Sequence, residues 1–170
     1  MKKFLYFILL CLISCNGAFA QSLGKMRLGC SRIDVVMNLP KGFNICKTNT
    51  NNQLTYATSE GDEYVSFYLT NGIVYKILMH KFIERGFDSS SVKSKLEDTI
   101  ISLCDSWGKP SYVGENIYWN FPSSKATFSY TISSTQMEMD PLRFSGSSVI
   151  KTFYKCYADI KLEKRTSMFE

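Results

Sequence analysis

The segment EYVSFYLTNGIVYKILMH, residues 63–80, constrains the fold of this chain most strongly. Two runs of alternating residues lie on either side of Asn71-Gly72, a pair that favours the type I′ turn of a tight hairpin. A two-residue turn pairs Tyr68 with Tyr75 and gives each strand one apolar face. The sequence therefore predicts an antiparallel sheet built around this hairpin.

Helices are expected before and after the hairpin. Ser31 is a plausible N-cap with Asp34 at the capping-box position, and the proline and glycine of residues 40–42 end that helix after about two turns. Ser90 or Ser91 is expected to cap a second helix over residues 92–107. The other expected strands are 53–58, 116–121, 126–132 and 148–160, with a long loop at 133–147.

This order predicts an α+β fold in which short helices pack on one face of an antiparallel sheet. The helix-plus-hairpin half covers residues 21–84, and the helix-plus-strands half covers residues 85–170. The two halves together form one compact globular unit. They resemble one another either as an internal tandem repeat or as any two α+β halves do.

The N-terminus has the order of a signal peptide. Lys2 and Lys3 precede an unbroken apolar run over residues 4–13, which is too short to span a bilayer. Residues 1–20 are therefore interpreted as a signal peptide that exports the chain to the periplasm or the medium.

Two cleavage sites compete within this leader. Ala18-Phe19-Ala20 fits an ordinary leader peptidase and would release a chain that begins at Gln21. Leu12-Ile13-Ser14-Cys15 resembles a lipobox and would leave Cys15 lipidated. We expect the first cut; the alternative is an outer-membrane lipoprotein anchored at Cys15, and a membrane contact is expected only through that anchor.

Charge excludes one class of partner. Loss of the two leader lysines lowers the formal net charge from +5 to +3, and the chain holds no block of Lys and Arg. A nucleic-acid-binding surface needs such a block, so no nucleic acid is expected.

Four cysteines remain after cleavage at Ala20, and they are the disulfide candidates: Cys30, Cys46, Cys104 and Cys156. An oxidising compartment allows two disulfides among them, while buried free thiols are the alternative. They contain no CxxC pair, so a zinc ribbon is not expected.

Catalytic signatures are missing from the sequence. No GxSxG, HExxH, P-loop or GxGxxG motif occurs, and His80 is the one histidine. A lone histidine holds no metal without acid or cysteine partners at suitable spacing. We therefore expect no enzyme, no metal and no cofactor. An acid, serine or cysteine within hydrogen-bond reach of His80 would favour the opposite interpretation.

Aromatic residues provide the strongest functional signal, with 10 Tyr, 12 Phe and 2 Trp in the chain. If helices cover one sheet face, strand alternation leaves an aromatic and basic set on the other face. Tyrosine is enriched in protein interfaces, so this set is the predicted partner-binding surface. Its members are Tyr64, Tyr68, Tyr75, Tyr118, Lys151, Phe153, Lys155 and Tyr157.

The segments LGCSRIDVVMNLPKGF, LTYAT and YVSFYLTNGIVYKI resemble a known pattern. They are similar to outer-membrane assembly lipoproteins of the BamE/SmpA type and to β-lactamase inhibitor protein, the BLIP-like superfamily. There a glycine-led helix ending in Leu-Gly-x-Pro precedes an aromatic strand and a hairpin ending in Phe-x-x-Gly-x-Val. Cys30 replaces the usual methionine here, and Pro40 arrives early.

The resemblance covers residues 24–80 and, more weakly, 92–134. It implies helices on an antiparallel sheet and a habit of binding other proteins. No inhibitory loop carries over residue by residue, so it does not imply β-lactamase inhibition.

Together these features predict a non-enzymatic, extracytoplasmic protein-binding or envelope-assembly module that contacts an envelope protein through the aromatic sheet face. The alternative is a small envelope hydrolase or a ligand- or glycan-binding protein.

Overall fold

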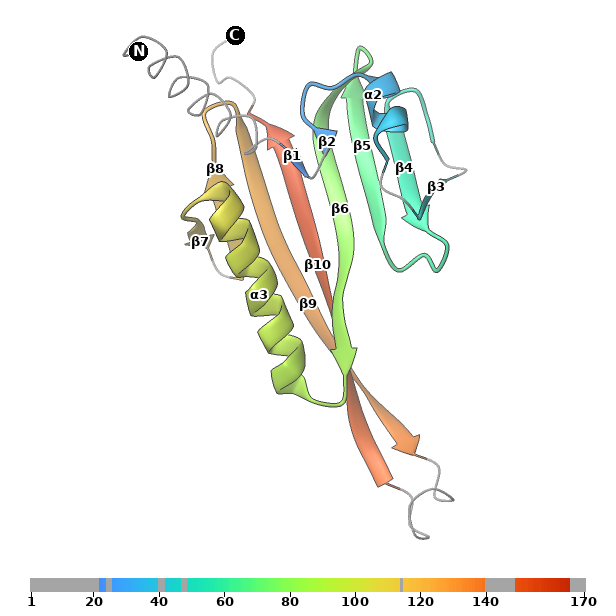
Figure 1. The fold of residues 1–170 in the computed structure, drawn as a ribbon, viewed down its shortest axis with the longest axis vertical. Helices are drawn as coiled ribbons and strands as arrows, with labels where there is room; N and C mark the ends of the chain where they lie inside the picture. Colours follow the sequence, from blue (N-terminus) through green and yellow to red (C-terminus); the bar gives the residue numbers. More distant parts are fainter. Residues whose placement is uncertain are drawn as a thin grey trace, which may run out of the picture.

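The computed structural model describes residues 22–23, 26–39, 42–46, 49–113, 115–139 and 149–165. Strands hold 58% of these residues, and two helices hold 20% (Figure 1). The helices are α2 (Arg32–Met37) and α3 (Ser89–Trp107). The strands are β1 (Ser22–Leu23), β2 (Met26–Arg27), β3 (Phe43–Ile45), β4 (Gln53–Thr58), β5 (Tyr64–Thr70), β6 (Ile73–Gly86), β7 (Ser111–Val113), β8 (Asn116–Asn120), β9 (Ser124–Met139) and β10 (Val149–Lys164).

One antiparallel sheet dominates the described structure. Its eight strands run in the order β3-β4-β5-β6-β10-β9-β8-β7, and β1 and β2 form a separate small ladder. The long strands β6 and β10 therefore pair at the centre of the sheet, while the three-residue strands β3 and β7 lie at its edges.

The predicted α+β class is wrong, because the described chain is mainly this β-sheet. The predicted last strand at 148–160 is confirmed, since β10 runs over Val149–Lys164. The sequence predicted a loop over residues 133–147, but β9 continues to Met139. This part of β9 is Ser- and Thr-rich and exposed on both faces. It therefore lacks the apolar alternation by which a half-buried strand is recognised.

The β5–β6 hairpin confirms the predicted turn but not the whole register. Asn71 and Gly72 both adopt positive φ angles, 52° and 76°, as a type I′ turn requires. A bulge then places Tyr68 opposite Lys76, so the predicted Tyr68–Tyr75 pair is wrong. Since one extra residue reverses the side-chain alternation, Ile77 lies in the core and Leu78 lies on the opposite face of the sheet.

Both helix starts are held by side-chain caps. The predicted capping box is present: the Ser31 hydroxyl accepts from the Asp34 N–H, and the Asp34 carboxylate accepts from the Ser31 N–H at 2.9 Å. The cap of α3 is Asp88 and not a serine, because its carboxylate accepts from the N–H groups of Ser90 and Ser91. The serines expected as caps are thus the donors.

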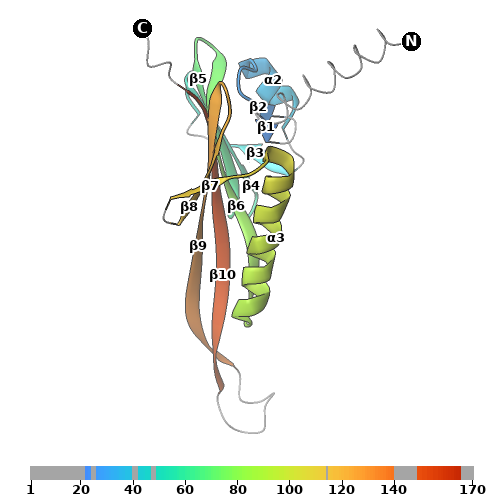
Figure 2. The same cartoon turned by 90° about the vertical axis from the view of Figure 1, so that its left-hand side faces the viewer.

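The core lies between one face of the sheet and the two described helices, and Val35 is the buried residue of α2. Helix α3 lies against that face, and its inner positions Val92 and Leu96 are buried with Phe67, Ile77 and Phe128 (Figure 2). At the end of α3, Trp107 meets Trp119 edge-to-face, with ring centroids 5.3 Å apart. The indole N–H of the fully buried Trp119 donates to the Gly108 carbonyl at 2.9 Å, so this buried polar atom is satisfied.

Neither described helix is long and apolar enough to cross a membrane. Residues 1–21, with the predicted signal peptide and Cys15, lie outside the described residues, as does Pro40. The division at residues 84 and 85 stays a prediction.

Candidate binding face

The sheet face opposite α3 carries the candidate site, and we call it the open face. Ladder partners in an antiparallel sheet share a face, so the register gives its members directly. The members of the open face that the argument uses are Tyr64, Ser66, Tyr68, Lys76, Leu78, His80, Phe82, Tyr118, Lys125, Thr127, Ser129, Tyr157, Asp159, Lys161 and Glu163. No described helix lies on this side of the sheet (Figure 2).

A stack of three rings forms the centre of the open face. The His80 ring lies between the rings of Tyr64 and Tyr157, with centroid distances of 5.0 and 5.1 Å and interplanar angles of 14°. Phe82 meets Tyr157 edge-on at 5.6 Å. The three central strands β5, β6 and β10 each contribute to this aromatic row, so the backbone ladders fix its spacing.

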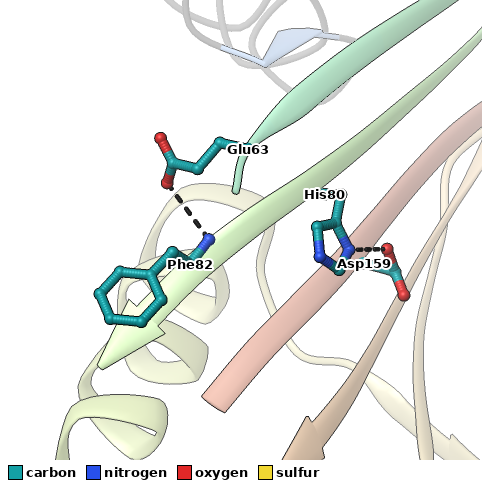
Figure 3. Close-up of polar contacts among 4 residues, drawn as sticks. All are labelled: Glu63, His80, Phe82 and Asp159. Atoms are coloured by element: carbon teal, nitrogen blue, oxygen red, sulfur yellow. Dashed lines mark hydrogen bonds and ion pairs between the residues drawn. The ribbon is translucent and has the colours of Figure 1, made fainter. Parts of the chain in front are cut away.

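An acid partner holds the histidine in place. The Nδ1 atom of His80 lies 2.8 Å from Oδ1 of Asp159, the residue opposite it on β10 (Figure 3). A carboxylate at Nδ1 favours a proton on that nitrogen and leaves Nε2 as the second polar atom. Burial, followed by the negative charge of Asp159, raises the pKa of the neighbouring Tyr64 phenol, which is therefore neutral at physiological pH.

This pair answers the question that the sequence posed about His80. An acid lies within hydrogen-bond reach, so an oriented base is present. Its partners among the described residues are Asp159 and the two tyrosine rings, and no serine or cysteine is among them. The arrangement orients an imidazole but supplies no nucleophile of its own.

A small pocket adjoins the stack. It has a volume of about 230 Å³ and is lined by Phe43, Glu63, Met79, His80 and Lys81. The Glu63 carboxylate at its rim accepts from the Phe82 N–H at 3.2 Å (Figure 3).

Three lysines of the open face lie on one side of the stack: Glu163 is the ladder partner of both Lys76 and Lys125, and Lys161 lies in the next row. The Lys76 ammonium lies 4.6 Å from the centroid of the Tyr68 ring, and Lys125 lies 4.2 Å from that of Tyr118. Lys161 contacts Glu163 at 2.9 Å. Cation–π contacts of this kind hold both groups at the surface in one orientation, which lowers the entropy lost when a partner binds.

The structure brings four of the eight predicted contact residues together on the open face: Tyr64, Tyr68, Tyr118 and Tyr157. Tyr75 is the extra residue of the β6 bulge and has no ladder partner. Three others, Lys151, Phe153 and Lys155, lie further along β10 on the same side of the sheet as Tyr157, since β10 pairs with β9 without a register shift. There Phe153 packs edge-on against Phe87 at 5.2 Å.

Sequence reasoning missed His80 and Asp159 as members of this surface. Side chains two positions apart in a strand lie on the same face, so His80 shares a face with Phe82 on β6. By the same rule Asp159 shares a face with Tyr157 on β10. The pairing of β6 with β10 brings these sets together, and no local signal encodes it because the two residues are 79 positions apart.

The four cysteines are free thiols in the structure. Cys30 and Cys156 are buried, and burial raises the pKa of both thiols. No group of three or more His, Cys, Asp and Glu side chains in the described part of the chain could hold a metal ion.

No protein-family model matches the chain, and a search of curated proteins finds no match either.

Proposed function

We propose that this chain is a non-enzymatic, extracytoplasmic protein-binding module that contacts an envelope protein through the open face. The observation that carries this proposal is the ring stack of Tyr64, His80 and Tyr157 on a sheet face that neither described helix covers.

An uncovered face of an antiparallel sheet is normally polar. The open face instead holds four tyrosines, a phenylalanine and a histidine among its lysines. Tyrosine supplies a large rigid contact area and a hydrogen bond at low entropic cost, which is why interfaces are rich in it. The stacked rings are already ordered, so binding would immobilise few further side chains.

The order of residues 1–20 supports export, and the resemblance of residues 24–80 to BamE/SmpA-type assembly lipoproteins supports an envelope partner. The intact mass of the protein from its native host shows which of the two cleavage sites is used, and so tests whether the protein is free or lipid-anchored. A chain beginning at Gln21 is a periplasmic or secreted binder. An acylated Cys15 is the alternative, a lipoprotein.

Photo-crosslinking in the native host tests the interface. A benzophenone amino acid replaces Tyr68 in one strain and Tyr112 in another. Tyr112 is the matched control, because it is a 66% exposed tyrosine whose ladder partner Ile117 belongs to the core face. We expect a crosslinked envelope protein from position 68 that position 112 does not capture.

Binding measurements with the purified chain and the purified captured protein then test whether the tyrosines contribute to the affinity. Tyr68→Ala with Tyr157→Ala should weaken binding of the captured protein at least 100-fold, as expected for two interface anchors. Tyr112→Ala should bind like the wild type. Unchanged affinity of the double variant, measured at a temperature at which it is folded, would refute the proposed interface.

The alternative function, a small envelope hydrolase or a ligand- or glycan-binding protein, is favoured by the His80–Asp159 pair beside the pocket. Incubation with peptidoglycan fragments, followed by mass spectrometry, examines it. Products that form with the wild type and not with His80→Ala would favour this alternative over the protein-binding module.

A further inference from the structure

Besides the three-residue edge strands β3 and β7, three longer stretches of strand in the described part of the sheet have a ladder partner on one side only. Strand β5 pairs with β6 no further than His80, and β10 meets β6 no further than Gly86. Strand β8 pairs with β9 no further than Phe128. Within the described chain, residues 81–86 of β6, 149–153 of β10 and 129–139 of β9 therefore have a free edge. A free edge presents unpaired N–H and C=O groups that can accept another strand.

Charged side chains protect the first two edges. On β6, the Phe82 N–H donates to the Glu63 carboxylate at 3.2 Å, and the Arg85 N–H donates to the Glu84 carboxylate at 2.9 Å. On β10, the ammonium of Lys151 lies 6.0 Å from the centroid of the Phe87 ring. Charges on an edge strand disfavour the approach of another strand.

The third edge has no such protection. Residues 129–139 read SYTISSTQMEM, with no Lys, Arg, Pro or Gly and with Glu138 as the single charge. Thr, Ile and Tyr favour strand pairing. Within the described residues, the one side-chain hydrogen bond from this stretch joins the Ser133 hydroxyl to the Lys155 carbonyl on the paired side.

Nothing in the described structure covers this edge. Figure 2 looks onto it: β7 and β8 lie further up the sheet, and α3 lies to one side. Tyr130 and Met137 are 38% and 44% exposed along it. The edge is eleven residues long, which exceeds the usual length of a whole strand.

We propose that the β9 edges of two copies of this chain pair antiparallel about a two-fold axis, which makes a dimer with one continuous sheet. A second copy fits because the segment then meets an identical segment whose single charge is Glu138. If the axis passes at Ser134, Glu138 lies opposite Tyr130 of the second copy and not opposite another Glu138. Two-fold pairing uses both β9 edges, so the assembly closes at two copies.

Sedimentation equilibrium tests the dimer. The full chain is expressed with residues 1–20 in place, purified in its processed form and measured from 1 to 100 µM. We expect a mass of twice the monomer at the upper concentrations. A monomer throughout this range would overturn the proposal.

Charge variants locate the interface. Ser134→Lys places two lysines next to the axis and should raise the dissociation constant at least 10-fold. Ser102→Lys on the exposed side of α3 is the matched control and should leave it unchanged. A dimer that Ser134→Lys does not weaken would show that the β9 edge is not the contact.

Mixing two oppositely charged variants distinguishes a variant that has lost the dimer contact from one that has lost its fold. Ser134→Lys and Ser134→Glu should each be monomeric with an unchanged circular dichroism spectrum. Together they should form a heterodimer at least as stable as the wild type, because opposite charges then meet at the axis. Failure of the mixed pair to associate would contradict the antiparallel β9 contact.

Discussion

The two faces of the sheet differ sharply although the same strands build them. Along β5, Phe67 is fully buried against the core, while the next residue, Tyr68, lies on the open face with Lys76 over its ring. The covered face holds apolar side chains with almost no exposure, and the open face holds rings, lysines and acids in contact with solvent. The comparison teaches that one strand can provide stability on one side and a recognition surface on the other.

This difference predicts where the chain tolerates change. Removal of a buried side chain costs its transfer free energy and leaves a cavity, whereas a half-exposed side chain leaves neither a cavity nor an unpaired polar group. Four experiments can break or sharpen this comparison.

The largest effect is expected from the neighbouring pair on β5. Phe67→Ala should lower the free energy of unfolding by about 3–5 kcal/mol, because it opens a cavity in the core on the covered face of the sheet. Tyr68→Ala should lower it by about 1 kcal/mol. Urea denaturation measures both, and an equal loss in the two variants would remove the energetic distinction between the faces.

Thiol reactivity extends the comparison to the cysteines. Cys30 and Cys156 are buried with raised thiol pKa values, whereas Cys46 and Cys104 are partly exposed. We expect the buried pair to react with a maleimide at least about 100-fold more slowly in the folded protein, since reaction requires local opening. Peptide mapping after timed labelling measures the rates. Equal rates at all four positions would show that the covered face opens readily.

The His80–Asp159 pair should contribute less than any core residue. A double-mutant cycle with His80→Ala and Asp159→Ala should give a coupling free energy of roughly 0.5–1 kcal/mol at neutral pH, because both side chains are partly exposed. Urea denaturation of the four proteins measures it. A coupling of several kcal/mol would mean that the open face stabilises the fold as the core does.

The smallest effect is expected at the cap of α3. Hydrogen bonds from Ser90 and Ser91 hold the pKa of Asp88 below its usual value of 3.8. The cap therefore contributes its full stability above that value and loses it as pH falls through the lower folded-state pKa. The melting temperature of the wild type should fall more steeply below about pH 4 than that of Asp88→Asn, which caps without titrating. Parallel curves would contradict this role.

Local patterns were sufficient for some elements and insufficient for others. The Asn71-Gly72 turn and the Ser31–Asp34 capping box follow from contacts within a few residues, and both are present. The bulge after Val74 is a tertiary adjustment that no local pattern marked. The extent of β9 was missed because a strand that is exposed on both faces needs no apolar alternation.

The candidate site shows the same division. Strand alternation placed Tyr64, Tyr68, Tyr118 and Tyr157 on one face, as the register has them. The neighbours of His80 depend on which strands pair, and this depends on the packing of the whole sheet. The acid opposite the histidine could therefore be recognised only in the structure.

The central pairing of β6 with β10 also sets a kinetic order. It joins residues about 79 positions apart, as His80 and Asp159 show, and the core cannot close before β10 is available. Chains with such distant contacts fold slowly, typically in milliseconds to seconds. The entropy of closing a long loop is lost before the contacts that stabilise the closed loop can form. Until the last strand arrives, the covered face of β6 is exposed to solvent. A chain that is threaded N-terminus first through a translocation pore would thus stay unfolded until almost all of it had passed.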